Sequence, residues 1–167
     1  MVIPLRDENP TKTVPFITLG LIAINVFVFV YELSLGLGSR GWEQFIYSFS
    51  MFPYRVVQGD LPAFVNIFTS MFLHGNWLHI IGNMLYLWIF GNNVEDYLGH
   101  MKFFGFYLLC GLGGTVGQIL SNPMSTIPNL GASGAIAGIL GAYLILYPGA
   151  RILTLVPLFF FIEIVRL

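Results

Sequence analysis

Residues 131–147 read G-A-S-G-A-I-A-G-I-L-G-A-Y-L-I-L-Y, a run of small and apolar side chains that contains one serine, Ser133, and no charge. A run of this length and composition is typical of a helix that crosses a lipid bilayer. Small residues on such a helix allow neighbouring backbones to approach closely. The stretch therefore predicts a packed membrane helix with a hydroxyl group in its first turn.

The composition of the whole chain indicates the same environment. Of 167 residues, 56% are hydrophobic and 9% are charged, whereas a soluble domain usually carries about 25% charged residues. We therefore expect an integral membrane protein. The formal net charge of −1 gives no basis for nucleic-acid binding, which requires clustered Lys and Arg. Cys110 is the only cysteine, so an internal disulfide and a multi-cysteine metal site are excluded.

Four apolar runs are candidates to cross the hydrocarbon core of roughly 30 Å. They cover residues 14–35, about 77–90 with a start near Phe72, 103–120 and 131–147. The connection between the first two, residues 36–76, is too aromatic for a solvated linker and predicts amphipathic helices in the membrane interface. The last apolar run, residues 152–165, would be only about 21 Å long as a helix. We expect it to be a partial fifth span.

The predicted fold class is all-α, a polytopic transmembrane helical bundle with about four full spans plus a partial fifth. Residues 1–13 are polar and are expected to be a cytoplasmic segment, and residues 14–167 are expected to form the membrane domain, incomplete at its C-terminus. A cleaved secretory signal is not indicated, because the first apolar run is long enough to span and follows a polar segment.

The ends of the second span and the orientation of the chain also follow from the sequence. Gly91-Asn92-Asn93 suits a helix C-cap, so residues 94–102 are expected to be an aqueous connection. With the N-terminus in the cytoplasm, the basic residues near helix ends divide four to three in favour of that side, which is the usual direction of the bias.

Three polar residues within the apolar runs are candidates for chemistry. Ser133 lies in the first turn of its helix, where free backbone N–H groups can stabilise an oxyanion. His79 and Asn83 are four residues apart and share one helix face. If the first span leads out of the cytoplasm, the spans carrying these residues both begin at the outer surface. Because polar groups in hydrocarbon need partners or a cavity, we expect one shared site.

Each of these residues also has a structural interpretation. Gly134 and Gly138 form a small-xxx-small packing motif, in which Ser133 would be only a small side chain. His79 and Asn83 would then form hydrogen bonds between helices, at roughly 1 kcal/mol each. His74, nearer the water, is expected to be an interfacial polar residue. No metal or organic cofactor is indicated, because three scattered histidines without paired carboxylates are no ligand set.

Three motifs together closely resemble the rhomboid family of intramembrane serine proteases: H-G-N-W-L-H-I-I-G-N at 74–83, G-N-N-V-E at 91–95 and G-A-S-G-A-I-A-G at 131–138. The resemblance covers nearly the whole chain. It implies that Ser133 is the nucleophile and that His79, Asn83 and the Ser133 backbone N–H form the oxyanion hole. Glu95 would be a structural acid at the cytoplasmic end of its span. The location would be a bacterial cytoplasmic membrane, and the substrates single-span membrane proteins whose helices unwind readily in the lipid bilayer.

The sequence departs from the family pattern in its C-terminal part. Rhomboid proteases use a Ser–His dyad whose histidine lies on a sixth span, and no histidine follows His100 here. We therefore expect a truncated sequence that lacks the base histidine. Since a serine without an adjacent base is a poor nucleophile, the chain as given is not expected to turn over substrate. Ala137 also stands where relatives often carry an aromatic residue.

Two other functions stay open. A non-catalytic, rhomboid-like membrane protein that binds clients would share the fold without the dyad. The missing histidine favours this alternative, and the intact Ser133, His79 and Asn83 oppose it. A small transporter or channel subunit would usually place ionisable groups near the membrane midplane, where the last three full spans have no charge. The sequence does not indicate an oligomeric state.

Overall fold

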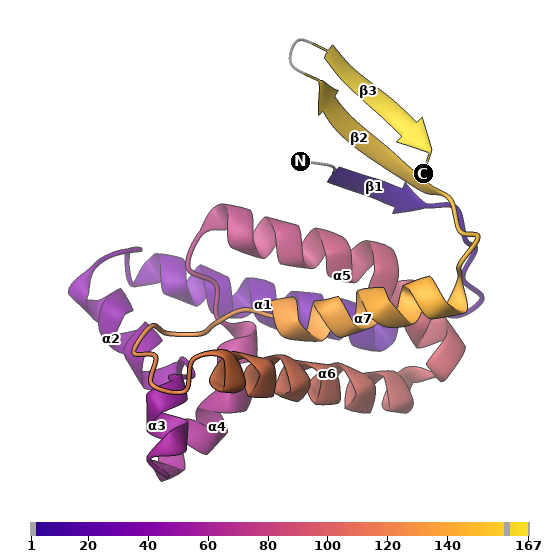
Figure 1. Cartoon of the computed structure of the whole chain (residues 1–167). Coiled ribbons are helices and arrows are strands. Elements are labelled where there is room, and N and C mark those ends of the chain that lie inside the picture. The colour runs from indigo at the N-terminus through magenta and orange to yellow at the C-terminus, as the bar shows by residue number, and fades with distance from the viewer. Residues whose placement is uncertain (1–2, 159–160, 167) are drawn as a thin grey trace.

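A computed structural model describes residues 3–158 and 161–166 of the chain (Figure 1). The elements in chain order are β1 (Ile3–Asp7), α1 (Phe16–Ser34), α2 (Arg40–Phe49), α3 (Pro53–Val57), α4 (Leu61–Thr69), the 3-10 helix η1 (Ser70–Phe72), α5 (Trp77–Leu98), α6 (His100–Ser121), α7 (Ser133–Leu146), β2 (Ile152–Leu158) and β3 (Phe161–Arg166). The fold is a bundle of four long helices with short helices at one end and a small sheet at the other.

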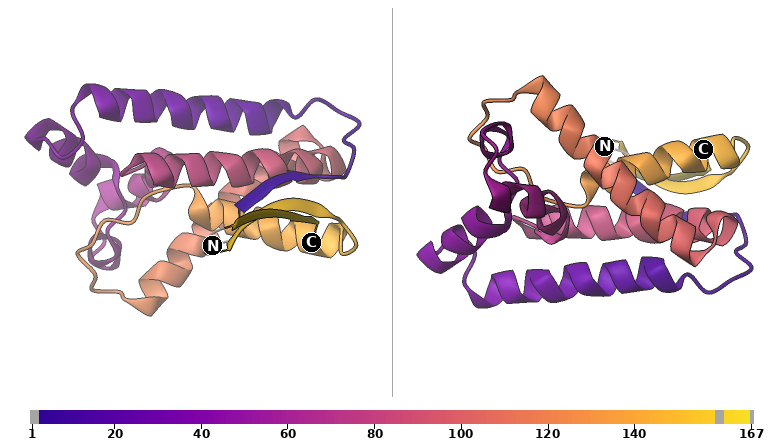
Figure 2. Two further views of the ribbon diagram at one scale, coloured as in Figure 1. Left: turned by 90° about the horizontal axis from the view of Figure 1, so that it is seen from above. Right: turned by 90° about the horizontal axis from the view of Figure 1, so that it is seen from below.

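Helix α5 lies between α1 and α7, and α6 packs across α7 and α5 (Figure 2). The core between these helices is built from fully buried apolar and aromatic side chains, among them Leu87, Phe103, Tyr107, Ile139 and Tyr143. Burial of this kind stabilises a fold by dispersion contacts. The predicted helical bundle is therefore present, and α5 and α7, which carry the candidate site residues, are neighbours in it.

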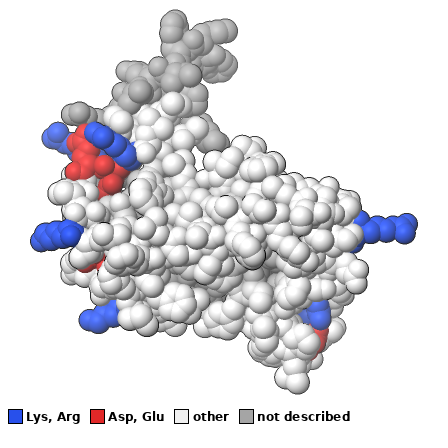
Figure 3. Space-filling view, turned by 180° about the vertical axis from the view of Figure 1, so that it is seen from behind, with Lys and Arg blue, Asp and Glu red and all other residues white. Residues whose placement is uncertain are grey.

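Within the described residues, α1 and α6 are long and apolar enough to cross a membrane, and α7 and residues Leu61–Phe72 are shorter apolar helices. The predicted spans at residues 14–35, 103–120 and 131–147 coincide with α1, α6 and α7 within a few residues. On the face shown in Figure 3, charged side chains gather toward the ends of the molecule, and the surface between them is without charge. This distribution suits a protein whose middle faces lipid. The number of spans stays a prediction.

The predicted end of the second span is wrong. Helix α5 continues through Gly91 and ends only at Gly99, whose φ of 78° suits a residue without a side chain. A Cβ atom at Gly91 would lie 3.1 Å from Leu87 Cδ1 and 3.2 Å from Thr18 Oγ1. Gly91 therefore permits close packing against α1 rather than ending α5. At its other end α5 begins at Trp77, where the Asn76 side chain accepts a hydrogen bond from His79 N at 2.9 Å.

The all-α class is also wrong for the two ends of the chain. Within the run 152–165, expected to be a partial helical span, residues 152–158 form β2 and residues 161–165 belong to β3. Strand β2 pairs antiparallel with β3 and also with β1 from the polar N-terminal segment. This run is rich in β-branched residues, which favour strands, and Pro157 disfavours a helix interior. The local sequence does not indicate that this run pairs with β1, because β1 lies about 150 residues earlier in the chain.

The first connection, residues 36–76, forms short helices as expected. Helix α2 is capped by Ser39, whose hydroxyl accepts a hydrogen bond from Trp42 N at 3.1 Å. Met51 and Asn129 form an isolated antiparallel bridge with N–O distances of 3.2 and 2.8 Å. The first connection is therefore fastened to the loop that leads into α7.

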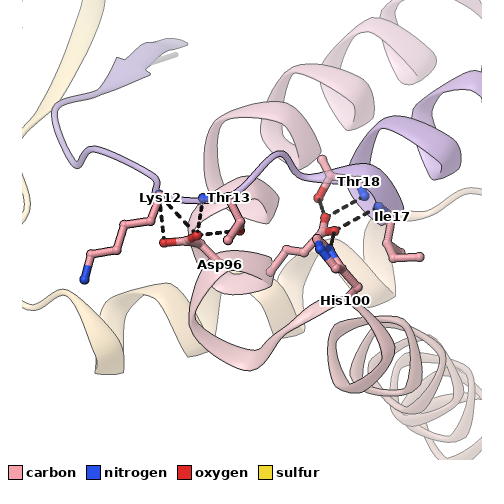
Figure 4. Close-up of polar contacts among 7 residues, drawn as sticks. Lys12, Thr13, Ile17, Thr18, Asp96 and His100 are labelled. Atoms are coloured by element: carbon pink, nitrogen blue, oxygen red, sulfur yellow. Dashed lines mark hydrogen bonds and ion pairs between the residues drawn. The ribbon is translucent and has the colours of Figure 1, made fainter.

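The carboxylate of Glu95, near the C-terminal end of α5, binds the backbone at the start of α1; Figure 4 shows the surroundings of Ile17 and Thr18 there. The fully buried Glu95 side chain accepts hydrogen bonds from Ile17 N at 2.9 Å and Thr18 N at 2.8 Å. It also contacts Thr18 Oγ1 at 2.7 Å and His100 Nδ1 at 2.6 Å. A carboxylate at a helix N-terminus satisfies free N–H groups and complements the helix dipole. Glu95 thus joins α1, α5 and α6.

The contact between α6 and α7 depends on two glycines. A Cβ atom at Gly114 would lie 2.9 Å from Gly134 Cα, and one at Gly134 would lie 3.3 Å from Gly114 Cα. Further along α7, a Cβ at Gly138 would lie within 2.5 Å of Cys110 Sγ. The predicted packing role of Gly134 and Gly138 is therefore supported, because the two helices approach at backbone distance.

Replacing Gly114 by Ala is expected to lower the free energy of unfolding by about 1–3 kcal/mol, because the added methyl group meets backbone that cannot rotate away. Gly113→Ala is the matched control, since a Cβ there has no neighbour within 4 Å among the described residues. Alanine is also the better helix former by about 1 kcal/mol, so this control should be neutral or stabilising. Unfolding each variant by adding dodecyl sulfate to the protein in mild detergent measures its free energy of unfolding. Equal effects of the two substitutions would contradict the packing argument.

Candidate active site

Ser133 is the first residue of α7. The preceding Gly131 has a φ of 109°, and its N–H donates to the Ser70 carbonyl at 2.8 Å. This backbone conformation favours glycine and turns the chain sharply into the helix. The Ser133 side chain is exposed, and the free N–H groups of the first turn lie around it. The local sequence therefore places a hydroxyl at the positive end of a helix.

His79 and Asn83 lie one turn apart on α5, next to the loop that precedes Ser133. His79 is partly buried, and Asn83 is buried. A Cβ atom at Gly131 would lie 2.5 Å from His79 Nε2 and 3.4 Å from Asn83 Nδ2. The His79 ring therefore occupies space that a side chain at position 131 would need, and the Asn83 amide lies at the edge of that space.

The three predicted site residues line one groove between α5 and α7. The groove has a volume of about 360 Å³, and its other lining residues are Leu78, Gly82, Tyr86, Ile136, Ala137 and Leu140. No hydrogen bond joins the Ser133 hydroxyl to another residue within 3–158 and 161–166. The structure thus brings Ser133, His79 and Asn83 to the walls of the same, mainly apolar groove.

A second, more polar cavity of about 130 Å³ lies on the other side of Ser133. Its polar lining includes Ser70, Thr115, Gln118 and Asn129. A cavity of this size and polarity can hold water, which a hydrolytic site requires. Sequence reasoning missed these residues because each is an isolated polar side chain in a different element.

His74 is not the interfacial polar residue that the sequence suggested. It lies in the loop before α5 and is fully buried, and its Nε2 lies 3.0 Å from Asn83 Nδ2. Its ring also packs edge-on against His79, with the ring centres 5.1 Å apart. Burial lowers the pKa of the His74 imidazole to about 4. The ring is therefore neutral at pH 7, and its Nε2 can accept a hydrogen bond from the Asn83 amide.

Among the described residues, no group of three or more His, Cys, Asp and Glu side chains could hold a metal ion. The groove is lined by a serine at a helix start and by an imidazole and an amide side chain from the neighbouring helix. This arrangement can bind a carbonyl carbon at the hydroxyl and its oxygen at the N–H donors. The groove is therefore a candidate hydrolytic site between two helices of an apolar helical bundle.

The sequence comparisons give the family. The model of the rhomboid domain matches residues 62–167, which is more than half of the chain and includes all three candidate residues. The chain belongs to the rhomboid family.

Curated relatives agree with this assignment. The chain is 34% identical over 108 residues to the mitochondrial Rhomboid protein 1 of Saccharomyces cerevisiae, covering 62% of this chain and 31% of that protein. It is 32% identical over 148 residues to Rhomboid protease GluP of Bacillus subtilis, covering 84% of this chain and 28% of that protein. It is also 36% identical over 78 residues to RHOMBOID-like protein 5 of Arabidopsis thaliana, covering 47% of this chain and 25% of that protein. The chain spans less than a third of the length of these relatives.

Proposed function

We propose that this protein is an intramembrane serine endopeptidase of the rhomboid type, which hydrolyses peptide bonds in or near the transmembrane helices of other membrane proteins. Ser133 Oγ attacks the carbonyl carbon of the substrate and forms a tetrahedral intermediate. His79, Asn83 and the Ser133 backbone N–H donate hydrogen bonds to its oxyanion. Loss of one such donor typically costs about 100-fold or more in rate.

The observation that carries the proposal is the shared groove of Ser133, His79 and Asn83. Helix packing explains the glycines around Ser133, but it requires neither a hydroxyl at the helix start nor an imidazole and an amide opposite it. Attack also requires a proton acceptor for Ser133 Oγ. The family resemblance points to a histidine on a further span of the full-length protein for this role.

The substrates follow from the setting of the groove. It lies among apolar helices, so a substrate reaches it as part of another membrane protein. A helical segment hides its carbonyl groups in hydrogen bonds, so we propose that substrates are single-span helices that unwind readily. The N-terminus would lie in the cytoplasm, with the site near the opposite surface.

Labelling of the full-length protein by a serine-directed fluorophosphonate tests this function. We expect covalent labelling of the wild type in mild detergent and none of Ser133→Ala. The matched control is Ser121→Ala, at the exposed end of α6, where the hydroxyl only donates to the Gly117 carbonyl at 2.8 Å. This control should label like the wild type. A full-length wild type that is folded but neither labelled nor able to cleave substrate would instead indicate a non-catalytic, client-binding protein.

A further inference from the structure

Glu32 is a buried carboxyl group in the last turn of α1, outside the groove of the candidate site. Its exposed fraction is 0%, although most carboxylate side chains lie at the surface. Its Oε1 accepts a hydrogen bond from His74 N at 2.9 Å. Its Oε2 is buried and has no hydrogen-bond partner among the residues that the structure describes.

The stability of the fold alone does not account for Glu32. Burial of a carboxyl oxygen without a partner costs free energy. A negative charge in the last turn of a helix is also on the unfavourable side of the helix dipole. An apolar residue of similar size would avoid both costs, so we expect the carboxyl group to serve a purpose other than stability.

A chain of short contacts leads from Glu32 to the candidate site. Glu32 fixes the backbone of His74, and His74 Nε2 lies 3.0 Å from Asn83 Nδ2. The Asn83 amide group has two N–H donors. If one donates to the neutral His74 ring, the ring fixes the orientation of the amide, and the second N–H is left for the groove.

Glu32 also contacts the first connection. The indole of Trp42, from α2, interacts with the Glu32 carboxyl group. The indole nitrogen is buried and, like Glu32 Oε2, has no hydrogen-bond partner within the described part of the chain. The carboxyl group therefore stands where α1, α2 and the loop before α5 meet.

We propose that Glu32 is a positioning residue for the oxyanion hole: its carboxyl group holds His74, and His74 holds the Asn83 amide in the orientation that serves the reaction. The catalytic consequence rests on the proposed function, but the positioning of Asn83 does not. Glutamine at position 32 keeps an oxygen that can accept from His74 N, whereas alanine removes it.

The test compares Glu32→Ala, Glu32→Gln and the control Glu43→Gln in the full-length protein. Glu43 is an exposed carboxylate one residue after Trp42 in α2. Two quantities are measured: the rate constant of fluorophosphonate labelling per folded molecule, and the side-chain amide resonance of Asn83 in protein labelled with ¹⁵N-asparagine. Asn83→Ala identifies the resonance. Cleavage of a single-span substrate gives kcat and KM separately.

Glu32→Ala is expected to move the Asn83 resonance, to slow labelling about tenfold or more and to lower kcat with little change in KM. Glu32→Gln should stay within about threefold of the wild-type rate, and Glu43→Gln should match the wild type. An unchanged Asn83 resonance in Glu32→Ala overturns the proposal, as does a variant that is only less stable while its labelling rate per folded molecule is unchanged. If the wild type is not labelled at all, the proposed function fails, and the resonance alone decides whether Glu32 positions Asn83.

Discussion

Ser133→Ala in the full-length protein is expected to lower kcat for cleavage of a single-span substrate by at least about 1000-fold, with little change in KM. In the proposed reaction the hydroxyl is the protein group that forms a covalent bond to the substrate, and loss of a serine nucleophile costs about a millionfold in a well-studied soluble protease. The methyl group of alanine fits the exposed position at the start of α7. Purified protein and substrate in detergent or vesicles, followed by the appearance of the cleaved fragment, give both constants.

A measurement of the stability of Ser133→Ala shows whether a loss of activity is due to unfolding. Ser133 forms no side-chain hydrogen bond with any described residue, so Ser133→Ala should unfold at the same denaturant concentration as the wild type within about 0.5 kcal/mol. A folded Ser133→Ala protein that cleaves substrate as well as the wild type would disprove the role of the hydroxyl.

Gly131→Ala is expected to slow both labelling and cleavage at Ser133 about 100-fold. The new Cβ would lie 2.5 Å from His79 Nε2 and 2.6 Å from His79 Cε1, so the imidazole must move. A displacement of about 1 Å in a catalytic group can cost about 100-fold in rate. The φ of 109° at this position adds backbone strain for any residue with a side chain. The rate constant of labelling per folded molecule measures the effect.

Gly99→Ala is the control that introduces backbone strain at a positive φ without a new side-chain contact. Gly99 also has a positive φ, of 78°, but a Cβ there would meet no described atom within 4 Å. This variant should lose stability by about 1–2 kcal/mol and keep the wild-type labelling rate. Equal labelling rates for Gly131→Ala and Gly99→Ala would mean that the backbone at 131 does not hold His79 in place.

The sequence predicted much of the helical bundle and of the site because both depend on local patterns. Long apolar runs fix α1, α6 and α7 with little regard to their neighbours. The spacing of His79 and Asn83 fixes their common helix face. The position of Ser133 at the start of an apolar run fixes its place at a helix N-terminus. The roles of these three residues stay predictions, although the structure brings them to one groove.

The parts that the sequence did not predict depend on contacts between distant residues. His74 was expected to be an interfacial polar residue, but it is buried, and the carboxyl group of Glu32, 42 residues earlier, accepts a hydrogen bond from its backbone N–H. Gly91 was expected to end a helix, but it packs against Thr18 of α1. The residues that form β2 were expected to be helical, but they pair with β1 from the other end of the chain. None of these partners can be recognised from the local sequence.

The length of α7 has a consequence for the place where a substrate would be cut. This helix has 14 residues, so it measures about 21 Å, against roughly 30 Å for the hydrocarbon core. If Tyr147 lies at the inner boundary of the core, Ser133 is about 9 Å short of the outer one. A scissile bond must therefore descend below the lipid headgroups to meet the hydroxyl. The length of α7 thus determines how deep in the bilayer the substrate would be cut. Water must reach the same depth, so the protein needs a hydrated passage to Ser133.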